Sequence, residues 1–206
     1  MTDAAAAHHK IHLRIHPGAI VHPLVLAAMF WFVAPLYDGL ALTATALPTR
    51  TGPAWLFAAC FLSIYLLGVF THEAGHVAAA RTVGGRLERV SLGLTIGVGI
   101  ETPGPRTNAQ QARISFWGPA TQIGLGGTLL ALGATLPSWD SPIFFGALLV
   151  LLEGAANLLL PLGRNSDAHK LFRSSWRCLR GRAEHPFRPE PSLGECLISD
   201  NTRERV

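Results

Sequence analysis

The chain has 206 residues, a length that favours one domain, and 49% of them are hydrophobic whereas only 15% are charged. Because a typical soluble domain has about 25% charged residues, this composition predicts a membrane protein rather than a soluble one. The formal net charge of +4 is explained by the Lys and Arg residues that membrane proteins retain in cytoplasmic loops, so it does not indicate nucleic-acid binding.

Four apolar stretches are long enough to cross a bilayer, which takes roughly 20 helical residues. They cover residues 20–47, 55–80, 114–136 and 143–162. The first is too long for the apolar core of a cleavable signal peptide, so we expect it to remain as a membrane anchor. The sequence therefore predicts a mainly α membrane protein with about four transmembrane helices.

The positions of Lys and Arg predict the orientation. All but Arg50 of the 17 Lys and Arg residues lie in the N-terminal segment, the loop after the second span or the C-terminal tail. These residues concentrate in cytoplasmic loops, so we expect a multi-pass cell-membrane protein with both termini cytoplasmic. This divides the chain into a cytosolic N-terminal segment (1–19), an intramembrane domain (20–165) and a cytosolic basic amphipathic helix, over 167–179, with a flexible tail (166–206).

Several histidines lie in or next to the N-terminal segment: His8, His9, His12, His16 and His22. His12 and His16 have a ligand-like spacing, but no acidic residue accompanies them. We therefore expect a solvated or headgroup-facing segment here rather than a metal site.

The second span ends in the sequence His72-Glu73-Ala74-Gly75-His76. Helical residues four apart share a face, so His72 and His76 can direct two imidazole nitrogens at one metal ion. Glu73 is then placed to act as a general base, because zinc lowers the pKa of its bound water to roughly 7. The motif predicts a zinc-dependent hydrolase site at the cytosolic end of an apolar helix, within reach of water.

Residues 90–100 alternate between apolar and small side chains, a period of two that predicts a strand. Its glycines predict a hairpin bend near Gly97 or a close approach of another backbone. The strand could add an extended peptide to its edge or could only cover the active-site helices, and the residues leave both open. After a predicted loop over 101–111, Gly118-Pro119 predicts a local break in the helical hydrogen bonds of the third span.

A catalytic zinc site usually has three protein ligands and one open position, so two histidines leave one ligand to find. Asp167 follows the fourth span at the membrane depth of His76, and His169 and Glu153 are its rivals. Glu153 lies deeper, inside the fourth span, where an ionisable group is a functional candidate, although it could also pair with Asn157. The residues alone leave all three candidates open.

Taken together, these residues resemble the site-2 protease family of intramembrane zinc metalloproteases. In that family His-Glu-x-x-His ends one transmembrane helix, Gly-Pro opens a later one, and an Asn/Leu/Pro-rich helix end leads to an Asp-Gly. Here the corresponding segments are 72–76, 118–119 and 157–167. The resemblance covers roughly residues 15–175 and is greatest to the compact sporulation-type branch, which has no PDZ domain.

The resemblance implies one Zn²⁺ per chain held by His72, His76 and Asp167, with Glu73 as the catalytic base. It implies that the substrate is a transmembrane protein, such as an anti-sigma factor or a signal-peptide remnant, cleaved amid membrane lipid. The chain departs from the family pattern at Ala168, where glycine is usual, and at Gln122, where asparagine often stands. The alternative is a catalytically inactive relative that acts as a membrane scaffold or chaperone, which an intact Glu73 disfavours.

Overall fold

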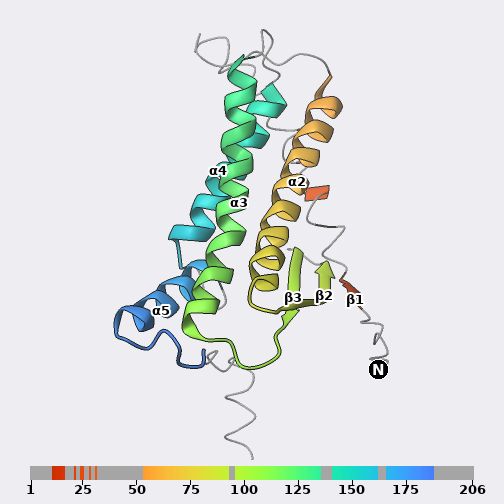
Figure 1. The fold of residues 1–206 in the computed structure, drawn as a ribbon. Helices are drawn as coiled ribbons and strands as arrows, with labels where there is room; N and C mark the ends of the chain where they lie inside the picture. The colour runs from red at the N-terminus through yellow and green to blue at the C-terminus, as the bar shows by residue number, and fades with distance from the viewer. Residues whose placement is uncertain are drawn as a thin grey trace, which may run out of the picture.

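The structure is a computed structural model that describes residues 11–16, 21, 24–25, 28, 31, 53–92, 96–135, 141–161 and 166–187. Within these residues three long helices pack side by side, and a small sheet and a shorter helix lie at one end of the bundle (Figure 1). The chain is therefore mainly helical with a small sheet, as the sequence predicts. Most of the predicted first span, 20–47, lies outside the described residues.

The bundle consists of α2 (Ala54–Arg81), α3 (Asn108–Thr135) and α4 (Ser141–Leu159), each in contact with the other two. Its buried apolar side chains are mostly small, as at Ala58, Ala80 and Ala147, so the helix axes can come close. Large apolar side chains instead cover the outer faces, for example Leu67 and Leu132, which are 49% and 58% exposed. Exposed apolar surface on this scale is typical of membrane contact.

Among the described residues, one helix is both long and apolar enough to cross a membrane, over Ala58–Arg81 of α2. α4 has a shorter apolar stretch, Ile143–Leu159. The number of spans, about four from the sequence, therefore remains a prediction.

The sheet has three strands in the order β1 (His12–Ile15), β2 (Arg86–Leu92) and β3 (Ile96–Glu101). β2 and β3 are antiparallel, with Val90 opposite Val98, and β1 is parallel to β2. The predicted strand region is thus a hairpin. Of the two alternatives for the glycines, a hairpin bend near Gly97 agrees with the structure: the connection falls between Leu92 and Ile96, and Gly97 itself lies within β3 opposite Ser91.

β1 is an element that the sequence does not predict. Its four residues, His12-Leu13-Arg14-Ile15, alternate polar and apolar side chains, which is the pattern of a strand. Four residues are too few for that alternation to stand out, and the strand forms because the backbone of β2 is available beside it.

α3 begins at Asn108, before the predicted start of the third span at 114. The backbone N–H groups of Asn108 and Ala109 donate to the carbonyl oxygens of His185 and Ala183, so the first turn is satisfied by a distant part of the chain. α3 also continues through Pro119 as one helix, so the predicted local break does not interrupt it.

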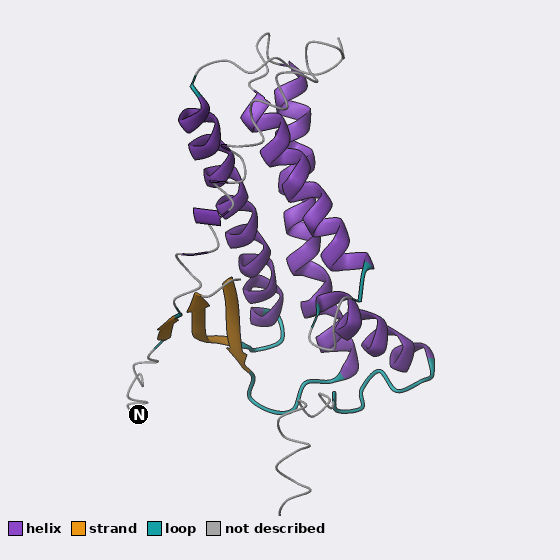
Figure 2. Ribbon diagram, turned by 180° about the vertical axis from the view of Figure 1, so that it is seen from behind, coloured by secondary structure: helices purple, strands orange, loops and turns teal. Residues whose placement is uncertain are grey.

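α5 (Asp167–Leu179) has the bounds of the predicted amphipathic helix. Ser166 caps it, because its side chain accepts a hydrogen bond from the backbone N–H of His169. α5 packs mainly against α3, with Ala168 and Ser174 buried. Seen from behind, α5 and the sheet lie on opposite sides of the same end of the bundle (Figure 2).

Candidate metal centre

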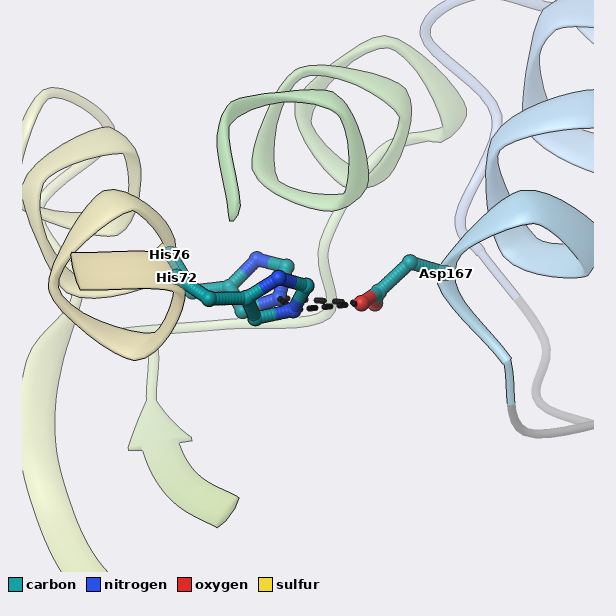
Figure 3. A group of neighbouring side chains, drawn as sticks. All are labelled: His72, His76 and Asp167. Carbon is teal, nitrogen blue, oxygen red and sulfur yellow. Dashed lines mark hydrogen bonds and ion pairs between the residues drawn. The ribbon is translucent and has the colours of Figure 1, made fainter. Parts of the chain in front are cut away.

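His72, His76 and Asp167 meet at this end of the bundle (Figure 3). The two histidines lie one turn apart on α2, and Asp167 is the first residue of α5. His72 Nε2, His76 Nε2 and Asp167 Oδ2 are each 3.1 Å from the other two atoms. The histidine side chains are 10% exposed and the Asp167 side chain 20%, so the carboxylate is the most accessible member of the group.

The second ring nitrogen of each histidine has its own hydrogen-bond partner. His72 Nδ1 lies 2.7 Å from Gln122 Oε1, and His76 Nδ1 lies 2.8 Å from the carbonyl oxygen of Ile114. Both partners are acceptors, so in the neutral imidazoles each Nδ1 carries the proton and each Nε2 presents a lone pair. Together with Asp167 Oδ2, three electron-pair donors face one another, an arrangement that is repulsive without a cation.

These residues fit a zinc ion. A tetrahedral zinc site with ligand atoms about 2.0–2.1 Å from the metal separates those atoms by roughly 3.3–3.4 Å. The observed separations of 3.1 Å are close to this value. Two imidazoles and one carboxylate also form a known donor set of catalytic zinc sites, which keep the fourth position for water or substrate.

Gln122 connects the metal-binding group to α4. Its Oε1 accepts from His72 Nδ1, and its Nε2 donates to Glu153 Oε2 at 3.0 Å. A carboxylate can only accept, so Glu153 determines which end of the Gln122 amide faces His72. Gln122 is 1% exposed, which keeps water from replacing either bond. The pair thereby favours the tautomer of His72 whose Nε2 can bind a metal.

Glu73 extends from α2 toward the sheet, where its Oε2 accepts a hydrogen bond from the backbone N–H of Val98 in β3, at 3.1 Å. Glu73 and Val98 line two cavities. One, of about 300 Å³, is also lined by His76 and Asp167, and the other, of about 390 Å³, lies beside apolar side chains of α2 and the sheet. The carboxylate therefore stands between the metal-binding group and an apolar cavity.

Two glycines allow α2 and α3 to approach closely at the site. A Cβ at Gly118 would overlap the His76 ring, and one at Gly75 would lie 2.5 Å from the carbonyl oxygen of Trp117. Glycine at both positions is therefore a steric requirement. It brings Ile114 and Gln122 of α3 within hydrogen-bonding distance of the two imidazoles.

The two rivals of Asp167 as third ligand lie outside the metal-binding group. His169 is two residues beyond Asp167, and its buried Nε2 has no hydrogen-bond partner among the described residues. Glu153 contacts Gln122 rather than the two histidines, so it affects the metal-binding group only through Gln122. Of the three candidates for the third ligand, Asp167 is thus the one that the structure places beside His72 and His76.

Two of the N-terminal histidines, His12 and His16, are also separate from this group. His12 and His16 are exposed, at and just after β1 on the sheet side of the protein. The remaining three, His8, His9 and His22, lie outside the described residues.

The Asp167 carboxyl has a shifted pKa. Burial opposes its ionisation, but hydrogen bonds from His72 and His76, when these imidazoles are protonated, outweigh burial and hold the pKa of this carboxyl well below its usual range. Asp167 therefore stays an anion, the form in which a carboxylate binds a metal.

Arg106 places a positive charge beside β3. Its guanidinium donates to Gln111 Oε1 and to the carbonyl oxygen of Ile100, and burial lowers its pKa from the usual value. All three residues line the cavity that His76 and Asp167 also line. This charge keeps that cavity polar, in contrast to the apolar cavity on the other side of Glu73.

Comparison with known proteins agrees with this geometry. Two proteins of Mycobacterium tuberculosis, from strains Erdman and H37Rv and both named "Putative zinc metalloprotease Rip3", are each 34% identical to the chain over 169 residues. A solved structure, the site-2 protease from Methanocaldococcus jannaschii, matches 93% of this chain and 74% of its own with a TM-score of 0.54. The chain thus resembles the Rip3 proteins in sequence and a site-2 protease in fold.

The comparisons differ in how much of each protein they cover and in sequence identity. The Rip3 match covers 76% of this chain but 41% of the Rip3 length, so the chain spans about two fifths of these relatives. The structural match has 19% sequence identity and shows a shared fold. A scan against models of known protein families finds no match.

Proposed function

We propose that this chain is a member of the site-2 protease family and an intramembrane zinc metalloendopeptidase. It would hydrolyse a peptide bond within or near a transmembrane segment of a membrane-tethered protein. The observation that carries the proposal is the convergence of three lone-pair donors at 3.1 Å, with Glu73 on the same helix one residue after His72. The name of the Rip3 relatives supports the same reaction class.

In this proposal His72, His76 and Asp167 hold one Zn²⁺ per chain, which when bound supplies a Lewis acid for the scissile carbonyl and acidifies water. Glu73 accepts a proton from the attacking water and donates it to the leaving amine. The Val98 N–H holds one oxygen of Glu73 and so restricts rotation of the carboxylate, which favours a constant position for the base.

A transmembrane helix must unwind locally before hydrolysis, because its peptide bonds are shielded by their own hydrogen bonds. β3 is an edge strand of the described sheet, and Val98 and Ile100 of this strand line the cavity of the metal-binding group. An unwound segment could therefore pair with β3 and lie extended beside Glu73. The apolar cavity lined by Phe70 and Val90 would accept one of its side chains.

The proposed topology is multi-pass, with about four spans and both termini cytoplasmic. The positions of Lys and Arg support it. Among the described residues they lie at the end of α2, in β1 and β2, near the start of α3, and in and after α5, and none lies in α4. By family resemblance, the substrate would be an anti-sigma factor or a signal-peptide remnant.

The decisive experiment measures zinc content and cleavage together. Wild type, Glu73→Gln and Asp167→Ala are purified in detergent, zinc is quantified, and each protein is incubated with a transmembrane reporter. We expect about one zinc per chain and cleavage for wild type. Glu73→Gln should keep zinc without cleaving, because it loses only the base, and Asp167→Ala should lose zinc.

The same measurements separate the proposal from its alternative. A wild type that purifies without zinc would overturn the hydrolase proposal. Zinc without cleavage of either the reporter or native membrane proteins would favour the inactive scaffold or chaperone, for which Ala168 in place of the usual glycine is the one local observation.

A further inference from the structure

α5 carries an exposed apolar stripe and, beside it, a basic one. Phe172, Trp176 and Leu179 follow one another at helical spacings of four and three residues, and they are 49%, 56% and 81% exposed. The basic stripe consists of Arg173, Arg177 and Arg180, each one residue after a member of the apolar stripe. Arg173 and Arg177 are half-buried, and Arg180 is exposed. With 3.6 residues per turn, the two stripes lie about 100° apart around the helix.

The third face of α5 is fixed to the protein. Ala168 and Ser174 are fully buried, and α5 packs mainly against α3. α5 therefore has one face on the bundle, one apolar stripe and one basic stripe. Figures 1 and 2 show that it runs obliquely to the bundle axis, at the end where α2 finishes and α3 begins.

The chemistry of the two stripes matches an anionic lipid surface. Amphipathic helices in the membrane interface insert Trp, Phe and Leu at the boundary of headgroups and acyl chains while Arg contacts anionic lipid. The Arg180 guanidinium lies 4.6 Å from the centre of the Trp176 ring, which joins the two stripes. A cavity of about 400 Å³ beyond the helix, lined by Arg177, Arg182 and His185, offers further positive charge to a phosphate headgroup.

We propose that α5 is an anionic-lipid-binding helix, and that its contact with the membrane helps to hold Asp167 in the metal-binding group. Asp167 is the first residue of α5, whereas both histidines lie on α2. The position of α5 thus determines whether the third donor reaches the other two. The part of this proposal that concerns Asp167 rests on the proposed function, and the lipid contact does not.

The lipid contact is tested by fluorescence quenching. Wild type and Trp176→Phe are reconstituted into vesicles of phosphatidylcholine and phosphatidylglycerol, with bromine placed either near the headgroup end or near the methyl end of the acyl chains. The difference between the two proteins isolates Trp176 from the other four tryptophans. We expect this difference to be quenched most by the shallow bromines.

Two results would overturn the lipid contact. One is a Trp176 signal that neither bromine position quenches. The other is a signal that becomes quenched only when the protein is diluted to a monomer, which would mean that a second copy of the chain covers the stripe.

The coupling is tested by zinc affinity, measured by competition with a chelator in vesicles with and without phosphatidylglycerol. We expect wild type to bind zinc roughly tenfold more tightly in the anionic vesicles, within the usual range of coupling between linked sites. Arg180→Glu should lose this difference. The matched control Arg86→Glu, an exposed arginine at the start of β2, should keep it.

The outcomes separate the two proposals. Equal zinc affinity in both vesicles would overturn the coupling and leave the protease proposal intact. Absence of zinc binding in both would overturn the protease proposal, while the quenching experiment would still decide whether α5 contacts lipid.

Discussion

The two histidines show how neighbouring residues make a helical motif competent for metal binding. Their spacing puts His72 and His76 on one face of α2, but spacing does not select which ring nitrogen carries the proton. The acceptors on α3 make that selection, through Gln122 Oε1 and the Ile114 carbonyl oxygen. The ligand geometry is thus a property of the contact between α2 and α3.

A prediction follows for Gln122. Gln122→Met has a similar length but cannot hydrogen-bond to His72, so the tautomer and ring orientation are no longer fixed. We expect zinc affinity to fall about 10- to 100-fold, the usual effect of losing an outer hydrogen-bond partner of a metal ligand. Chelator competition measures the affinity, and the visible spectrum of the Co²⁺-substituted protein reports the ligand geometry independently of activity.

Variants at α4 provide the controls. Glu153→Gln retains an acceptor for the Gln122 amide and should lose less affinity than Glu153→Leu, which has none. Val150→Ala removes fully buried apolar contacts from the same helix without touching the hydrogen bonds, so it should lower stability and leave zinc affinity unchanged. Equal zinc affinities for Glu153→Leu and wild type would contradict the role of this pair.

The site is only partly predictable from individual residues. His72, Glu73 and His76 form a local pattern that helical geometry alone interprets. Asp167 lies 91 residues from His76, and family resemblance rather than spacing selects it. The link from Gln122 to Glu153 depends on how α3 packs against α4. Its one signal in the sequence is the ionisable Glu153 inside an apolar helix, which requires a partner.

At the scale of elements, the helices with strong patterns are the easiest to predict. α5 has the predicted bounds because its amphipathic pattern is regular and Ser166 caps it. The predicted start of α3 is too late, because the first turn is satisfied by the backbone beyond α5 rather than by local residues. β1 is not predicted at all, because a four-residue strand is stabilised by its partner and not by its own sequence.

The edge of β3 gives a prediction at this scale. Val98 donates its backbone N–H to Glu73, outside the sheet, so Val98→Pro should leave the β2–β3 pairing largely intact. It removes the donor that restrains Glu73. We expect cleavage of the transmembrane reporter to fall at least about tenfold, equivalent to roughly 1.4 kcal/mol, with zinc content unchanged.

Val98→Ala is the matched control, because it shortens the side chain and keeps the backbone N–H. It should cleave at a rate close to wild type. If Val98→Pro cleaves as fast as wild type, the edge of β3 has no part in the reaction, and the sheet serves only to cover the active-site helices.

At the scale of the whole molecule, the metal-binding group joins helices that lie far apart in sequence. α2 supplies two donors and α5 supplies the third, and α3 packs against both of these helices. A bound metal would therefore connect α2 to α5 directly, in addition to the packing that each makes with α3. Loss of the metal would leave α5 held mainly by its contact with α3.

This arrangement predicts that zinc stabilises the folded protein. At a free zinc concentration 100 times the dissociation constant, the expected gain in the free energy of unfolding is about 2.7 kcal/mol, if zinc binds the folded state only. Thermal unfolding in detergent, followed by circular dichroism with zinc or with a chelator, measures the gain.

Variants of the site provide the controls. Asp167→Ala should unfold at the same temperature in both conditions, because two imidazoles on one helix bind zinc weakly and do not connect α2 to α5. Glu73→Gln should respond to zinc as wild type does, since it keeps all three donors. If zinc raised the unfolding temperature of Asp167→Ala as much as that of wild type, the metal would not bridge the two helices.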